Sequence, residues 1–254
     1  MPFPLDRPVW AVRLQFFISG FLFATWGVHV PTVRAHYGLD EQRLALTMLA
    51  AGVGALCGLA FAGRWVGRWG PQRVAWLTGL VAALTVMALL ASGSWMLLLA
   101  TMWVFGAAGS VYDVAMNAGG AALEAASGRR LMSRFHALFS FGGMAGAAFG
   151  SALLSMRAPP VLHLALTGVA AVAAVWWATR PALPDMAAAP AASESRRFGV
   201  GRGRGVLWML GALAAIGLVA EGAMYDWSVL YMQRELGSEP ALSALAYASF
   251  SVAM

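Results

Sequence analysis

The stretch that decides the fold class is 102-MWVFGAAGSVYDVAMNAGGAALEA-125. It is apolar enough to cross a membrane, yet it contains Asp113, Asn117 and Glu124. A charged side chain at the centre of a membrane-spanning helix costs about 2.5–3.5 kcal/mol on insertion scales. We therefore expect Asp113 to face a protein interior or a water-filled cavity. The alternative is a structural clamp, in which Asp113 only bonds a neighbouring helix or an arginine.

The composition of the whole chain agrees with a membrane protein. Of the 254 residues, 60% are hydrophobic and 11% are charged, whereas roughly a quarter of the residues of a soluble domain are charged. A span needs about 20 predominantly apolar residues, and the chain has several such runs, with a turn at 92-SGSW-95. They predict an all-α integral membrane fold with helices at about 10–32, 44–63, 74–92, 95–121, 136–156, 160–179 and 205–232.

The final apolar run suggests that more chain should follow. Ala241–Met254 has 14 residues, too few to span a bilayer. We expect three parts: a complete six-helix bundle at 1–180, a cytoplasmic linker rich in Pro, Ala, Gly and Arg at 181–205, and the first one or two helices of a second bundle at 206–254. A complete protein with a re-entrant final segment is the alternative.

The charges predict the orientation of the chain. All seventeen positive residues are arginine. If the helices alternate from a cytoplasmic N-terminus, thirteen arginines fall on the inner side and four on the outer side, Arg34, Arg43, Arg157 and Arg234. This is the positive-inside pattern, so the N-terminus is expected in the cytoplasm. The basic pI of about 10.4 then reflects topology and does not argue for a nucleic-acid partner.

Polar side chains gather on single faces of the first, fourth, fifth and seventh predicted helices, at spacings of three and four residues. Such faces should look into a shared hydrated interior. A satisfied interfacial histidine at position 29 and aromatic-belt roles for the tryptophans remain alternatives. The candidates for proton coupling are Asp113, Glu221 and Asp226, and those for solute binding are Trp26, His29, Asn117, His136 and Tyr225.

A further motif, 63-GRWVGRWGPQRV-74, resembles the cytoplasmic signature loop of the major facilitator superfamily. Gly63, Arg68 and Gly70 match the pattern in place, and Arg73 supplies a late basic residue. The usual aspartate of the loop is replaced by Gly67, so its charge relay with the neighbouring helix is not carried over.

Four other segments, 28-VHVP-31, 113-DVAMN-117, 131-LMSRFHALFSFGG-143 and 221-EGAMYDWS-228, resemble a bacterial branch of that superfamily, the MosC-like inner-membrane carriers. The resemblance implies two six-helix bundles around a central cavity lined by the first, fourth, seventh and tenth helices. It also implies alternating-access transport of a small polar solute, for example a sugar-like or amino-cyclitol-like one, either facilitative or proton-coupled. The chain is then expected to be a monomer in the bacterial inner membrane, and to be inactive without the remaining helices.

Two other functions stay open: a multidrug or metabolite exporter of the same superfamily, and a transport-inactive membrane sensor or scaffold. An enzyme is not expected. The four histidines lie on different predicted segments and form no HExxH or similar metal motif, so we expect neither a metal nor another cofactor.

Overall fold

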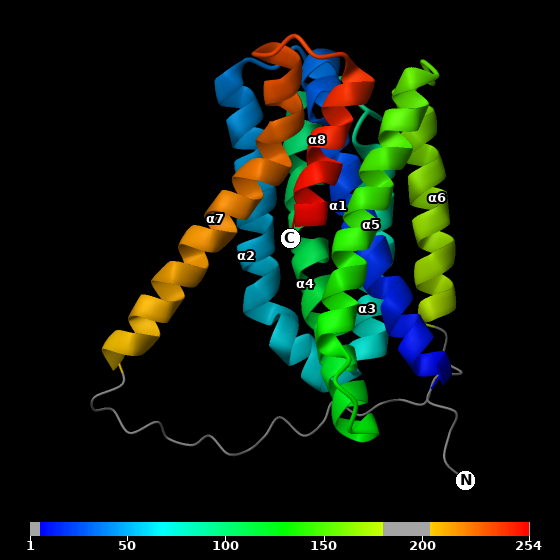
Figure 1. Ribbon diagram of the computed structural model, residues 1–254, viewed down its shortest axis with the longest axis vertical. Coiled ribbons are helices and arrows are strands. Elements are labelled where there is room, and N and C mark those ends of the chain that lie inside the picture. The colour runs from blue at the N-terminus through cyan, green and yellow to red at the C-terminus, as the bar shows by residue number, and fades with distance from the viewer. Residues whose placement is uncertain (1–5, 180–203, 254) are drawn as a thin grey trace.

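The computed structural model describes residues 6–179 and 204–253, and all the regular structure within these residues is α-helical. The chain runs up and down through a bundle, so that successive helices are close to antiparallel (Figure 1). The helices are α1 Asp6–Tyr37, α2 Glu41–Trp69, α3 Pro71–Ala88, α4 Trp95–Ser127, α5 Met132–Ser155, α6 Pro160–Ala178, α7 Arg204–Arg234 and α8 Pro240–Ala253.

The predicted helix positions are confirmed, but most helices extend beyond the apolar runs. Six are long and apolar enough to cross a membrane, namely α1, α2, α4, α5, α6 and α7. Helix α3 was also expected to span and does not meet that criterion, because polar Gln72 and Arg73 occupy the first turn of its 18 residues. It still packs inside the bundle, between α4 and α6.

The signature segment 63–74 is not the loop that we expected. Helix α2 continues to Trp69 and α3 begins at Pro71, so the connection is Gly70 alone. Gly70 adopts a φ of 79°, a conformation in which a side chain is strained, and Pro71 favours the first turn of the next helix. Gly63 and Arg68 therefore lie on α2, and Arg73 lies on α3.

Glycines set the closest helix contacts. A Cβ atom on Gly54 of α2 would collide with the backbone of Trp103 in α4, and one on Gly106 of α4 would collide with the backbone of Ala51 in α2. Gly20 of α1 and Gly142 of α5 make the same reciprocal contact between those helices. Small residues let membrane helices approach closely and gain van der Waals contact.

Helices α7 and α8 join this bundle unevenly. Helix α8 packs along α5, while α7 meets α1 at the end of the bundle where the α1–α2 and α7–α8 turns lie, which we call the outer end. The first half of α7 slants away from the other helices (Figure 1), and its side chains from Trp208 to Ala220 are exposed. The predicted linker at 181–205 falls almost entirely outside the described residues.

Candidate functional site

A cavity of about 240 Å³ lies between the facing parts of α1 and α7. Helix α7 contributes both of its acids to the lining, Glu221 and Asp226. Opposite them, Trp26 of α1 donates a hydrogen bond from its indole Nε1 to Asp226 Oδ1 at 3.2 Å. The cavity is lined by Phe23, Trp26, Phe139, Leu218, Glu221, Gly222, Tyr225, Asp226 and Tyr247.

Aromatic rings form much of the remaining wall. The rings of Tyr225 and Tyr247 lie 4.5 Å apart between their centroids, and Phe250 meets Tyr225 edge-on at 4.9 Å. Gly27 makes room for this arrangement, because a Cβ atom there would lie 2.6 Å from the Tyr247 ring. The cavity therefore offers flat apolar faces beside two carboxyl groups, a combination suited to a small ligand with both apolar and polar sides.

Four of the predicted site residues, Trp26, Glu221, Tyr225 and Asp226, thus meet in one cavity. Tyr247 lines the same cavity, although it was not among the predicted site residues. A signal was present in 243-SALAYASFS-251, where Ser243, Tyr247 and Ser251 recur every four residues in an apolar helix. All three are buried, so the hydroxyl-bearing face of α8 is turned toward the protein.

A second cavity, of about 720 Å³, lies between α5 and α8. His136 lines it together with Ser133, Ser140 and Ser251. The imidazole of His136 also packs edge-on against Phe16 of α1, with 5.2 Å between ring centroids.

Asp113 and Asn117 of α4 line neither of these two cavities. Asn117 Nδ2 donates to Asp113 Oδ1 at 3.2 Å and to the Asp113 carbonyl at 2.9 Å. The side chain of Asp113 is exposed, as a residue that faces a water-filled cavity would also be, so its predicted orientation stays a prediction. Neither Asp113 nor Asn117 shares a cavity with the acids of α7. The structure therefore keeps Asp113 apart from Glu221 and Asp226.

His29 also lies away from the α1–α7 cavity. It is fully buried, and its Nε2 lies 2.7 Å from Nδ1 of His163 on α6. Its Nδ1 lies 3.2 Å from the Thr32 hydroxyl. Both ring nitrogens of His29 therefore have partners, as the alternative of a satisfied histidine expects, and the pair also links α1 to α6. A helical pattern could not reveal it, since His29 and His163 are separated by 134 residues.

Glu124 has a structural role at the other end of α4. Its carboxylate accepts hydrogen bonds from the backbone N–H groups of Leu131 and Met132, at the start of α5. Capping the positive end of a helix satisfies otherwise unpaired backbone donors and suits a negative charge.

Apolar helices of membrane-spanning length, which enclose a cavity lined by two carboxyl groups, define the class, a multi-pass α-helical membrane protein. Within that class, the chain belongs to the Major Facilitator Superfamily, whose family model matches residues 14–254.

Three relatives give the resemblance more detail. The chain is 34% identical over 244 residues to an uncharacterised MFS-type transporter of Yersinia pestis, covering 96% of this chain and 62% of that protein. It is 30% identical over 251 residues to an uncharacterised transporter of Sinorhizobium fredii, covering 98% and 66%. It is 29% identical over 249 residues to the membrane protein MosC of Rhizobium meliloti, covering 96% and 58%.

These matches confirm the superfamily and the MosC-like resemblance that the motifs predicted. The chain spans about three-fifths of the length of the curated relatives that it matches. No solved structure matches it significantly.

Proposed function

We propose that the protein is a secondary transporter that moves a small polar solute across the bacterial inner membrane by alternating access, coupled to proton movement. The observation that carries this proposal is the cavity in which Glu221 and Asp226 of α7 face Trp26 of α1. Ionisable side chains at membrane depth are rare and commonly mark solute and proton pathways. The transporter names of two relatives support the same function.

In this proposal the N-terminus is cytoplasmic, as the arginine distribution predicts. Helices α1 and α7 then meet at the outer end, and the first half of α7 slants away from the other helices toward the inner side. The Trp26–Asp226 hydrogen bond joins the two helices. Opening the outer side requires this bond to break, so a proton or solute that competes for Asp226 would favour that transition.

The proposed solute has hydroxyl or amino groups on one side and an apolar face on the other, as sugars and amino-cyclitols do. Glu221 and Asp226 would accept hydrogen bonds from the polar groups, while Tyr225 and Tyr247 would contact the apolar face. Asp113, with Asn117 and His136, would form a second proton-binding position nearer the inner side. Protonation there would neutralise a carboxylate inside the membrane.

The test is solute-driven proton movement in proteoliposomes that contain a pH-sensitive dye and the product of the full-length gene, because the 254-residue chain alone is expected to be inactive. Panels of sugars and amino-cyclitols are added outside, with and without an imposed pH gradient. We expect the protein to change the internal pH with at least one of these solutes. Glu221→Gln and Asp226→Asn should reduce the initial rate about tenfold or more, the size expected when a charge-assisted contact is lost.

Glu235→Gln is the matched control, because Glu235 is an exposed acid that directly follows the last turn of α7 and does not line the cavity. Asp113→Asn tests the second position in the same assay. If the acid variants keep both the transport rate and its pH dependence, the assignment of the carboxyl groups is wrong. Solute flux without proton movement would instead indicate facilitative transport.

A second candidate, a multidrug or metabolite exporter, is favoured by the aromatic wall of the cavity. Such rings suit lipophilic or cationic cargo. The same liposomes, loaded with a fluorescent lipophilic cation, distinguish the two functions, because only an exporter should release it in response to a pH gradient. A folded protein that moves no solute in either assay would be a membrane sensor or scaffold.

A further inference from the structure

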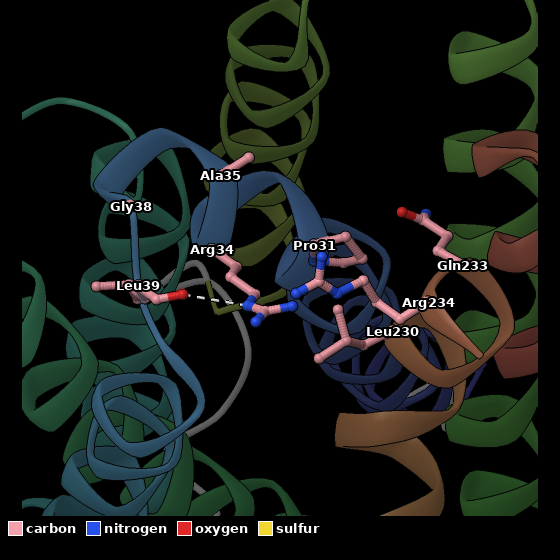
Figure 2. A pocket seen from close by; sticks show the side chains of 8 residues that line it. All are labelled: Pro31, Arg34, Ala35, Gly38, Leu39, Leu230, Gln233 and Arg234. Atoms are coloured by element: carbon pink, nitrogen blue, oxygen red, sulfur yellow. Dashed lines mark hydrogen bonds between the residues drawn. The ribbon is translucent and has the colours of Figure 1, made fainter. Parts of the chain in front are cut away.

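A separate basic pocket of about 310 Å³ lies at the outer end, between the last turns of α1 and α7. Two arginines line it, Arg34 from α1 and Arg234 from α7. Figure 2 shows both guanidinium groups turned into the space between the helices and toward each other, next to Pro31 and Leu230. The described lining consists of Pro31, Arg34, Ala35, Gly38, Leu39, Leu230, Gln233 and Arg234.

The side chain of Arg34 is held in place by a hydrogen bond to the segment that follows α1. Its Nε donates a hydrogen bond to the Leu39 carbonyl at 3.1 Å, and its side chain is half-buried. This bond uses one of the five N–H donors of a guanidinium, and the terminal nitrogens lie toward Arg234. A side chain already oriented in this way loses little further freedom when it binds a ligand.

No carboxylate occurs among the described residues that line the pocket. The acid nearest in sequence to Arg34, Asp40, is occupied elsewhere, because its Oδ1 accepts from the backbone N–H of Arg43 at 2.7 Å and caps α2. Two positive groups therefore converge from two helices without a negative lining group between them. Like charges repel, and a bound anion would convert that repulsion into attraction to both arginines.

We propose that this pocket binds an anionic group of the phosphate or carboxylate type, which bridges Arg34 and Arg234. Planar guanidinium groups match the oxygens of such anions with paired hydrogen bonds, and Gln233 adds a neutral amide to the same wall. The anion holds the last turns of α1 and α7 together at the outer end. The site lies apart from the Glu221–Asp226 cavity, and it does not depend on the proposed transport.

The probe for this site is inorganic phosphate, added to the purified chain in a neutral detergent. We expect phosphate to raise the melting temperature, because a ligand that binds only the folded state stabilises it. The apparent affinity should fall about tenfold or more in Arg34→Gln and in Arg234→Gln, since each loses a charge-assisted contact. Arg157→Gln is the control, an exposed arginine outside the pocket, and it should behave as the wild type.

A second readout follows the contact between the helices. With Cys57→Ser as the background, spin labels at His36→Cys and Leu236→Cys report the distance between the outer ends of α1 and α7, and both positions are exposed. Phosphate should narrow that distance distribution, and Arg234→Gln should abolish the effect. Arg234 is exposed, so its replacement is compatible with folding even if that of the half-buried Arg34 is not.

The source of the anion is decided in nanodiscs. If phosphate acts in neutral phosphatidylcholine discs, the site takes a free anion. If only phosphatidylglycerol discs stabilise the protein, and the arginine variants remove that gain, a lipid headgroup is the anion. Either result supports the site. The proposal is wrong if neither anion stabilises the protein, or if Arg157→Gln loses the response to the same extent as the two pocket variants.

Discussion

At the scale of single residues, the role of each polar side chain depends on the residue that it contacts. Trp26 and His29 are three positions apart on α1, yet Trp26 contacts Asp226 of α7 and His29 contacts His163 of α6. Residues at this spacing point about 60° apart around a helix. Because α1 is surrounded by other helices, this angle is enough to place Trp26 in a cavity and His29 in a buried contact with another helix.

The buried histidine pair leads to a stability prediction. His29→Phe keeps most of the side-chain volume but leaves His163 Nδ1 without its hydrogen-bond partner. The other ring nitrogen of His163, Nε2, already has no hydrogen-bond partner among the described residues. We expect a loss of about 1–3 kcal/mol in the free energy of unfolding, the usual cost of an unpaired buried polar group. Thermal or denaturant unfolding in detergent would measure it.

His36→Phe provides the control, because His36 is exposed and its bond to the Ser92 carbonyl lies at the surface. It should change stability by less than about 0.5 kcal/mol. The double variant His29→Phe/His163→Phe removes both polar partners, so it should be less destabilised than two independent losses would predict. Full additivity would show that the two imidazoles are not coupled.

At the scale of helices, close packing depends on glycines that the hydrophobic pattern cannot distinguish from one another. Gly52 and Gly54 are two positions apart on α2. A Cβ atom on Gly52 would meet nothing within 4 Å, whereas one on Gly54 would collide with the backbone of Trp103. Of these two glycines, only Gly54 lies at the interface with α4.

This difference gives a matched pair of substitutions. Gly54→Val should force α2 and α4 apart and lower the free energy of unfolding by about 1–3 kcal/mol, the range seen for overpacked interfaces. Gly52→Val should be nearly neutral. Unfolding of both variants under the same conditions checks the prediction, and equal losses would mean that α2 and α4 do not pack as described.

At the scale of the whole molecule, α7 joins the other helices near one end of the bundle. Helix α7 contacts α1 near the outer end, and its first half slants away (Figure 1). The arginine distribution predicts that this end faces the outside of the cell. Topology is therefore measurable separately from transport.

Single cysteines in a Cys57→Ser background would test that orientation in intact cells. A membrane-impermeant thiol reagent should label His36→Cys, at the α1–α2 turn, and should not label Ser127→Cys, at the α4–α5 turn. If Ser127→Cys were labelled and His36→Cys were not, the chain would have the opposite orientation and the prediction would be wrong.

Much of the fold followed from the amino-acid sequence. Long apolar runs predicted where the helices lie, because a bilayer imposes a minimum length on each span and local hydrogen bonds satisfy the backbone within it. The signature residues Gly63, Arg68 and Gly70 predicted the superfamily. The helical spacing also predicted which side chains share a face, including Glu221 and Tyr225 on α7, which line the same cavity.

The tertiary structure alone decided which faces meet. Spacing along a helix defines a side chain's direction relative to its own axis, but the rotation and pairing of helices come from contacts such as Gly54 with Trp103 and Gly106 with Ala51. Those contacts separate Asp113 from the Glu221–Asp226 cavity, join His29 to His163, and bring Arg34 beside Arg234. The partners His29 and His163, and likewise Arg34 and Arg234, lie far apart in the chain, so only packing in three dimensions brings them together.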